Sequence, residues 1–347
     1  MRRGVPVASY LGIDIGGSSC KIVERSGSEM HMVAARMPEN MISFGQITSP
    51  ETMASFLRQV RAEHNVRSRN AVLVLSAAQS FFRHVTLPKM SVEEVKLNLP
   101  YEFRDFISGD ADEYIYDYAV DPHERSGISA DVGATDPDGL SLFAAAVSKD
   151  LVSTYVDILG KAGFKLKSVI PAPMAYTRLL DECVKADPAM ADRNIVLVNI
   201  GLSEVVLTLF KGSHFEASKT IDFGCNQIDA AIAEVKGIDA YTASAYKHSN
   251  FEGVLDLPEC QAVYDRIAIE VSKVVNFYNF SSQDKDVELM YFHGGGAQIP
   301  QLTETIANAI DVPAMPSAAL LPKAAAGQDN APVCTLAVGA LLEGEAM

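Results

Sequence analysis

The sequence predicts an α/β protein made of two related halves, and three observations support this prediction. The chain has 347 residues, more than the roughly 250–300 that one hydrophobic core usually serves. Strand-like apolar runs alternate with amphipathic helical patterns. A hairpin pattern with glycine at its tip occurs twice, at residues 14–18 (DIGGS) and 199–203 (NIGLS). We therefore expect two homologous domains.

The first half opens with one of these hairpins. Residues 11–15 and 20–25 have strand character and flank a Gly-Gly-Ser-Ser turn. Residues 31–37 extend the predicted sheet, a helix with one apolar face follows over 51–63, and residues 71–75 are a buried type of strand. This alternation predicts the first α/β unit.

A segment with a different order of elements follows. Its predicted strand, helix, strand and strand occupy residues 80–87, 91–107, 114–120 and 140–147. Ser91 and Glu94 form a capping box at the start of the helix, and Pro100 is expected to kink or split it. A loop at 121–139 joins the last two strands, and an amphipathic helix over 149–162 ends at Gly163.

The second half repeats the hairpin. Strands at 195–200 and 205–210 flank Gly201, and an offset of 185 residues keeps the apolar strand, the glycine and the serine of both hairpins in register. A strand over 287–292 and a helix over 299–310 flank a glycine triplet. Such a loop lets a backbone lie against a nucleoside or a phosphate, although close packing of a strand on a helix favours glycine as well.

Composition excludes several classes of function. The formal charge of −15 makes nucleic acid an unlikely partner, and the five cysteines fit neither a disulfide framework nor a metal or redox motif. We find no secretory signal and no apolar run long enough to span a bilayer, so we expect a cytoplasmic protein without direct membrane insertion. The histidines lack metal spacing, and no GxSxG motif is present.

Glycine-tipped hairpins suit phosphate chemistry. Without Cβ atoms in the way, main-chain N–H groups can approach a phosphate, and Ser18 and Ser19 add hydroxyl donors. Asp14, at the end of a strand, can hold a hydrated Mg²⁺ ion. A single such turn is as easily a plain surface turn, but the second copy favours a nucleotide cleft. A P-loop is excluded, because no GK[ST] follows and the next element is a strand.

These motifs resemble those of the actin, Hsp70 and sugar-kinase superfamily, and nearly the whole chain is similar to the PilM family of type IV pilus assembly proteins. Further similarities are LPKM at 87–90, AGF at 162–164 and PMA at 173–175. The resemblance implies ATP or ADP with Mg²⁺ as cofactors, and Asp14 as the metal residue. It implies these cofactor-binding residues: Asp14, Gly16, Gly17, Ser18, Ser19, Lys21, Asn199, Gly201, Ser203, Gly224, Lys247, Gly294, Gly295 and Gly296.

The resemblance also implies an actin-like (ribonuclease H-like) duplicated fold with an inserted SHS2-type subdomain. The first large subdomain would comprise residues 1–78, completed by 166–190 and a C-terminal helix at 331–347. The insert would comprise 79–165. The second large subdomain would comprise 191–225 and 286–330, and a smaller subdomain 226–285.

Two positions depart from the family pattern. Asn199 stands where an Asp is expected, and Ser244 where related proteins often have Glu. An amide lacks the negative charge that favours Mg²⁺ and cannot act as a base. We therefore expect nucleotide binding with weak or no ATP hydrolysis.

Three functions follow from the resemblance. The first is a scaffold of pilus, secretion or competence assembly, which binds the short cytoplasmic N-terminus of a PilN-like inner-membrane protein and lies at the inner face of the membrane. A pilus motor ATPase and a second copy of the chain are further expected partners. The alternatives are a sugar-type kinase, whose ExGH and Cys-rich zinc motifs are missing, and an FtsA-like polymerising protein, although the chain ends in an acidic stretch.

Overall fold

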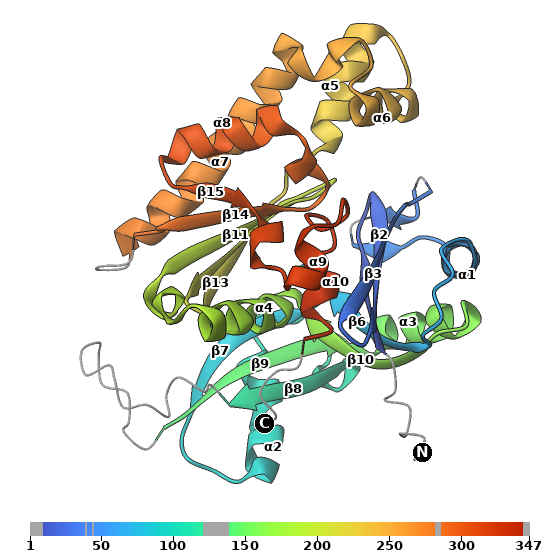
Figure 1. Cartoon of the computed structure of the whole chain (residues 1–347). Helices are drawn as coiled ribbons and strands as arrows, with labels where there is room; N and C mark the ends of the chain where they lie inside the picture. Colours follow the sequence, from blue (N-terminus) through green and yellow to red (C-terminus); the bar gives the residue numbers. More distant parts are fainter. Residues whose placement is uncertain (1–9, 39, 44, 121–138, 282–285, 343–347) are drawn as a thin grey trace, which may run out of the picture.

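A computed structural model describes residues 10–38, 40–43, 45–120, 139–281 and 286–342. Two five-stranded sheets with their helices form two halves, and a three-stranded sheet lies beneath both (Figure 1). A short pair, β4 and β5 (Ile42–Ser43 and Gln46–Ile47), lies apart from these sheets. The predicted α/β class with two related halves is confirmed.

The first sheet has the order β10-β6-β1-β2-β3. Its strands are Lys165–Pro171, Asn70–Leu75, Tyr10–Ile15, Ser19–Ser26 and Glu29–Arg36. β1, β2 and β3 are antiparallel neighbours, whereas β6 and β10 run parallel to β1. Every strand predicted for this sheet is present, and β10 is an addition.

The second sheet repeats this arrangement. Its order is β13-β12-β11-β14-β15, and its strands are His214–Ile221, Val205–Lys211, Asn194–Ile200, Leu289–His293 and Ala314–Pro316. Three antiparallel strands are again followed by two parallel ones. The predicted duplication is therefore visible in the topology. The sequence analysis did not identify β13, in which most side chains are only half-buried.

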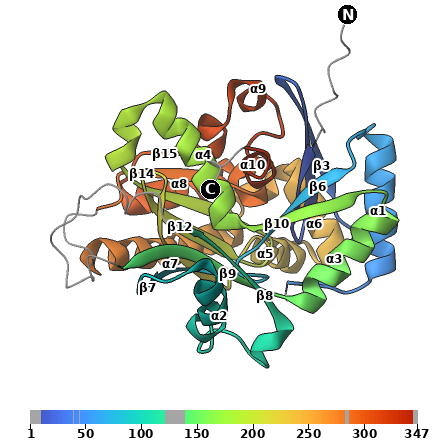
Figure 2. The ribbon, with the colours of Figure 1, turned by 90° about the horizontal axis from the view of Figure 1, so that it is seen from below.

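The helices cover the sheets in layers (Figure 2). Their bounds are Pro50–Glu63 (α1), Lys149–Lys161 (α3), Ala172–Ala186 (α4), Asn226–Lys236 (α5), Ala240–Ser249 (α6), Pro258–Ser281 (α7), Pro300–Ile310 (α8), Lys323–Ala326 (α9) and Thr335–Gly339 (α10). Helices α1 and α3 share one core with the first sheet, and α7 and α8 share another with the second. Helices α5 and α6 lie at the far end of the second half (Figure 1).

The third sheet forms a small insert. It consists of β7 (Phe81–Leu87), α2 (Val92–Glu102), β8 (Tyr114–Val120) and β9 (Leu140–Ser148), with strand order β7-β9-β8. The predicted order of strand, helix, strand and strand is confirmed, as is the capping box of Ser91 and Glu94. The helix ends at Glu102 and not at Ile107, because Pro100 removes a main-chain donor in its last turn.

Helix α3 falls within the predicted limits of the insert, residues 79–165. Its buried residues Tyr155, Ile158 and Leu159 pack with Leu57 of α1 in the core of the first sheet. This helix thus shares its core with the first half. The subdomain limits stay a prediction.

The chain returns to the first half at its C-terminal end. Helix α10 packs on β1 and α4, and a Cβ atom built on Gly12 would lie 2.0 Å from the carbonyl oxygen of Ala337. Such close packing requires glycine at that position. The predicted helix over 331–347 is shorter here, and residues 343–347, like the predicted loop at 121–138, lie outside the described residues.

Candidate functional site

The two predicted hairpins have the same turn geometry. In the first, the Gly16 N–H donates to the Ser19 carbonyl at 3.1 Å. In the second, the Gly201 N–H donates to the Glu204 carbonyl at 2.9 Å. These pairs are related by the 185-residue offset of the sequence repeat, so the duplication extends to individual hydrogen bonds.

Three glycine-containing turns converge between the two halves. A Cβ atom built on Gly17 would lie 3.4 Å from the Leu202 side chain, so the tips of the two hairpins touch. A Cβ atom on Gly295, in the loop after β14, would lie 3.6 Å from Ser18 Oγ. The predicted phosphate-binding turns and the predicted nucleoside loop are thus neighbours in space, although 185 residues separate Gly17 from Leu202 and 277 separate Ser18 from Gly295.

Asp14 and Lys21 form an ion pair beneath the first turn. They are cross-strand partners on β1 and β2, their Oδ2 and Nζ atoms are 3.2 Å apart, and their side chains are only 16% and 9% exposed. A Cβ atom on Gly16 would lie 3.0 Å from Lys21 Nζ, so the ammonium group lies directly against the turn. The one carboxylate predicted to face a metal therefore already has a cationic neighbour.

Asn199 lies against the glycine triplet. A Cβ atom on Gly294 would lie 2.5 Å from Asn199 Oδ1 and 2.7 Å from the Ile200 carbonyl, and Gly294 has a φ of +89°. Both facts require glycine at this position. On Gly296, a Cβ atom would lie 2.2 Å from the Ile200 side chain, so the same close packing requires glycine there as well.

A buried pair of residues behind the site was missed by the sequence analysis. The Tyr176 hydroxyl of α4 and His293 Nε2 of β14 are 2.5 Å apart. Burial, assisted by the charge of Lys21, lowers the pKa of His293 to about 3, so the imidazole is neutral. His293 is thus a buried histidine, and no local pattern shows a partner 117 residues away.

Gly224 supports the second hairpin. A Cβ atom there would lie 2.6 Å from the Leu202 carbonyl, which leaves no room for a side chain. The main-chain N–H of Cys225 donates to the Gly201 carbonyl at 3.1 Å, and that of Asn226 donates to the Leu202 carbonyl at 2.8 Å. The start of α5 thereby fixes the position of this turn. Ser203, at its tip, is exposed.

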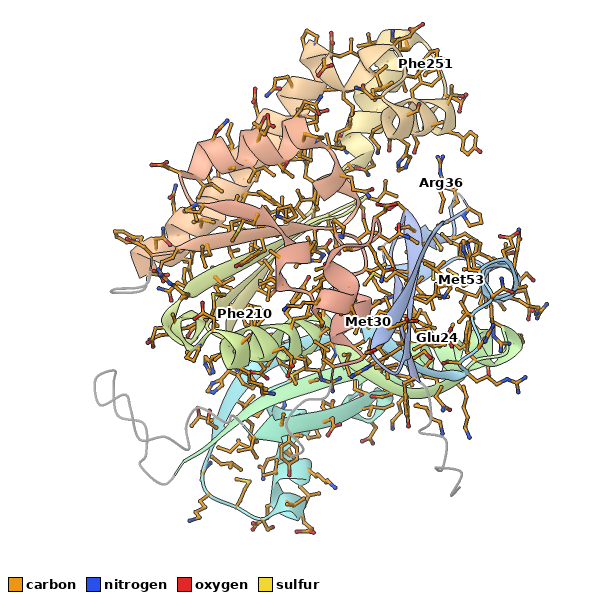
Figure 3. The ribbon with its side chains drawn as sticks, viewed as in Figure 1. Glu24, Met30, Arg36, Met53, Phe210 and Phe251 are labelled. Carbon is orange, nitrogen blue, oxygen red and sulfur yellow. The ribbon has the colours of Figure 1, made fainter. Side chains whose placement is uncertain are left out.

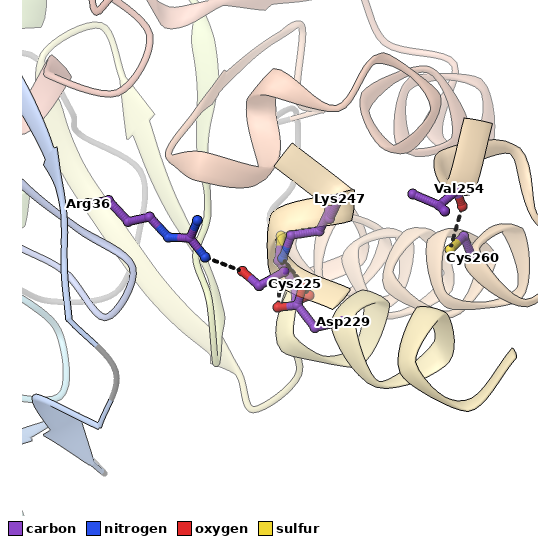
Figure 4. A network of polar contacts seen from close by, with 7 residues as sticks. Arg36, Cys225, Asp229, Lys247, Val254 and Cys260 are labelled. Atoms are coloured by element: carbon purple, nitrogen blue, oxygen red, sulfur yellow. Dashed lines mark hydrogen bonds and ion pairs between the residues drawn. The ribbon is translucent and has the colours of Figure 1, made fainter. Parts of the chain in front are cut away.

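Lys247 is buried between α5 and α6 and not directed freely into a cleft. Its Nζ atom donates to Asp229 at 2.8 Å and to the Cys225 carbonyl at 3.2 Å (Figure 4). Cys225 in turn lies against the glycine triplet, because a Cβ atom on Gly296 would be 2.7 Å from its sulfur. Lys247 is therefore joined to the other candidate residues through Cys225.

A side-chain contact joins the two halves at the mouth of this region. Arg36, at the end of β3, donates from Nη2 to Ser244 Oγ at 3.2 Å, and its guanidinium lies 5.4 Å from the centre of the Tyr241 ring. Figure 3 shows Arg36 extending from the first half toward the lobe that contains Phe251, and Figure 4 shows the contact in detail. Ser244, where a Glu was expected, thus has a partner in the other half.

The residues brought together suit a phosphate group. One cation, three glycine-containing turns and two nearby serines are the donors that phosphate oxygens accept from. For Mg²⁺ the set offers one carboxylate and one amide, Asp14 and Asn199, which fits an ion that keeps most of its water ligands.

A family model described as type IV pilus assembly protein PilM matches residues 12–320. The chain belongs to the PilM family. A solved structure of a PilM–PilN type IV pilus biogenesis complex is 20% identical, with a TM-score of 0.79, and the match covers 98% of this chain and 100% of that one. The match favours an assembly protein over the kinase and polymerising alternatives.

A second solved structure supports the same fold outside the PilM family. The ethanolamine utilization protein EutJ from Carboxydothermus hydrogenoformans is 13% identical, with a TM-score of 0.57, and the match covers 98% of this chain and 91% of that one. The predicted actin-like fold is thus confirmed. Within the described residues, no helix combines the length and apolar character needed to cross a bilayer.

This PilM-family chain has a second concave region, where the insert meets both halves. A cavity of about 240 Å³ is lined by Ala77, Ser80, Phe81, Phe82, Arg83, Phe103, Phe106, Pro173, Ser218 and Thr220. Phe106 is 52% exposed, and the Arg83 guanidinium lies 4.4 Å from the centre of its ring. In contrast, Val85 is buried in the core of the insert. Residues 81–85 therefore include both surface and core side chains.

Proposed function

We propose that this PilM-family protein is a nucleotide-binding scaffold at the inner face of the cytoplasmic membrane. ATP or ADP with Mg²⁺ binds between the two hairpins, and a PilN-like inner-membrane protein binds beside the insert through its short cytoplasmic N-terminus. The observation that carries the proposal is the convergence of three glycine-containing turns, the first of which lies against the Lys21 ammonium group. Such a set of donors has few uses other than holding phosphate oxygens.

The partner proposal rests on the cavity beside the insert. Several aromatic side chains line it, and Phe81 and Phe106 stay partly exposed. Grooves that hold short peptides derive most of their affinity from a few buried apolar anchors. The similar PilM–PilN structure, which covers nearly all of this chain, supports a partner of the PilN type.

Calorimetry with the purified chain tests the nucleotide proposal. We expect saturable heat for ATP and for ADP, and stronger binding when Mg²⁺ is present. Asp14→Asn keeps a hydrogen-bond acceptor for Lys21 but removes the charge that faces the metal, so the Mg²⁺-dependent part of the affinity should fall. Folded protein that gives no heat with either nucleotide would overturn the proposal.

Peptide binding tests the partner proposal separately. A labelled N-terminal peptide of the PilN-type protein from the same genome should bind the wild-type chain, and Phe106→Asp should weaken this binding by about tenfold or more. Phe280→Asp is the matched control, since Phe280 is 94% exposed on α7, far from the insert in sequence. Nucleotide affinity should stay unchanged in both variants. Equal losses of peptide binding would place the contact elsewhere.

A further inference from the structure

A group of positive charges gathers at one edge of the first half. Residues 58–69 and 161–167 contain seven Lys and Arg but only one acidic residue, Glu63, in a chain whose formal charge is −15. We call this group the basic edge, and its members are Arg58, Arg61, Arg67, Arg69, Lys161, Lys165 and Lys167. Its charge is therefore opposite to that of the molecule as a whole.

The topology brings the two segments of the basic edge together. Strands β6 and β10 run parallel and begin side by side, and the Lys165 N–H donates to the Arg69 carbonyl at 2.7 Å. Helices α1 and α3, which pack together, end at the same edge (Figure 2). Arg58 joins their ends, because its Nη2 donates to the Lys161 carbonyl at 2.7 Å. This edge is opposite the strand ends that carry the glycine-containing turns.

A cavity of about 360 Å³ opens within the basic edge. Among the described residues, those that line it are Arg58, Arg61, Ala62, Asn65, Val66 and Arg67, and none of these is acidic. The Arg61 guanidinium lies 5.3 Å from the centre of the Phe164 ring, and its buried Nε finds no hydrogen-bond partner within the described part of the chain. Three guanidinium groups thus surround a space that lacks a counter-charge.

The nearest carboxylates are engaged with other groups. Glu24 (Figure 3) accepts hydrogen bonds from the main-chain and side-chain groups of Ser68. Glu51 pairs with Lys161, and Glu63 accepts from Gln59. Of the seven cations, Lys161 alone has an ion pair among the described residues. Glu24 and Glu63 keep their negative charge, because their donors are neutral, but the six other cations outnumber them and leave positive charge for an external anion.

We propose that the basic edge binds the phosphate groups of an anionic lipid surface. Guanidinium groups bind phosphates through two parallel hydrogen bonds, and each Lys or Arg near an anionic bilayer adds attraction over about one Debye length. The exposed charges extend along two strand starts and two helix ends, which is broader than one small anion needs and suits a layer of headgroups. The protein would thus bind the membrane surface directly, without insertion. This contact would add to the link to the membrane that the PilN-like protein provides under the proposed function.

Vesicle cosedimentation of the full chain tests the proposal. Vesicles of phosphatidylcholine alone should not bind the chain, whereas vesicles that also contain phosphatidylglycerol should bind it, and added salt should release it. The triple variant Arg67→Glu/Lys165→Glu/Lys167→Glu reverses the charge of three exposed side chains. Because none of them is buried, the variant should fold normally. It should bind phosphatidylglycerol vesicles about a hundredfold more weakly.

The matched control changes the net charge by the same amount elsewhere. This control is the triple variant Lys211→Glu/Lys273→Glu/Lys323→Glu, whose three exposed lysines lie on β12, α7 and α9. Its binding to vesicles should change by less than about threefold. Equal losses in both triple variants, or no binding to phosphatidylglycerol vesicles, would overturn the proposal. Calorimetric binding of inorganic phosphate without vesicle binding would assign the site to a soluble anion instead, and so would overturn the membrane assignment. Nucleotide affinity should stay unchanged in both triples, so this test is independent of the proposed function.

Discussion

In the first hairpin the cross-strand pair at the end of β1 is Asp14 with Lys21, whereas the same pair in the second hairpin is Asn199 with Val206. The backbones match down to the hydrogen bond that closes each turn. The first pair carries two opposite charges, and the second carries none. Duplication has thus preserved the shape of the turn in both halves, but of these two pairs only the first is charged.

The difference continues onto the neighbouring parallel strands. Val74 of β6 lies beside Asp14, and His293 of β14 lies beside Asn199. Burial keeps His293 uncharged, so the second half presents a neutral polar row where the first presents an ion pair beside an apolar residue. In such a site both hairpins face the ligand, but the charged side chains of these strand ends belong to the first hairpin alone.

The largest effect should come from Lys21→Met. Removal of the ammonium group leaves the Asp14 carboxylate mostly buried without its counter-ion, which should lower the free energy of unfolding by about 3 kcal/mol and strongly weaken ATP binding. Val206→Met changes the equivalent residue of the second hairpin and should cost less than about 1.5 kcal/mol. Chemical denaturation and calorimetry measure both variants. Similar losses would show that the two hairpins contribute equally.

The next effect is a pH dependence that arises from His293, because its counterpart in the first half, Val74, does not titrate. The pKa of His293 is about 3 in the folded protein, against 6.5 as the ordinary value, so the unfolded chain takes up a proton first as the pH falls. Stability from this residue is complete above pH 6.5 and is lost toward pH 3, with a slope of about 1.4 kcal/mol per pH unit. Urea unfolding between about pH 5 and 6.5 should show this slope in the wild type and a smaller one in His293→Asn.

A smaller effect is expected from Asn199→Asp, which makes the two halves more alike. A second carboxylate should raise Mg²⁺ affinity in the presence of ATP by about tenfold. We expect phosphate release by the wild type to stay near background, since the amide cannot act as a base. Wild-type turnover on the order of 1 s⁻¹ or faster would contradict this prediction.

The smallest effect should come from Arg36→Ala. Arg36 joins the halves through one hydrogen bond and one ring contact at an exposed position. A contact between a cation and a ring at such a position stabilises a protein by about 0.5–1 kcal/mol. Nucleotide dissociation should accelerate by about threefold. Arg25→Ala is the control, because Arg25 lies on β2 of the same sheet and its side chain donates to the nearby Gly27 carbonyl within that sheet's own hairpin. A stopped-flow displacement experiment compares the two.

Local patterns made the hairpins and the insert predictable. Short apolar, β-branched runs identified the strands on both sides of the turns at Gly16 and Gly201, and the capping box located the start of α2. The repeat then implied that the two turns meet. These features depend on interactions between residues close in sequence, or on a symmetry that the sequence itself displays.

Features that depend on tertiary packing were not predictable in the same way. Tyr176 and His293 meet because α4 packs between the halves, and Lys247 finds Asp229 only through the packing of α6 on α5. The amphipathic pattern of α3 gives one apolar face but cannot say which sheet that face covers. The structure shows that this face packs in the core of the first sheet.

The insert begins and ends on two adjacent strands. Phe81 at the start of β7 pairs with Ala146 near the end of β9, so the chain leaves and re-enters the first half at nearly the same point. Because the insert also has a core of its own, a short turn could replace it without breaking either large sheet. This segment can therefore be exchanged in evolution, and its surface can change while the three converging glycine-containing turns keep their arrangement.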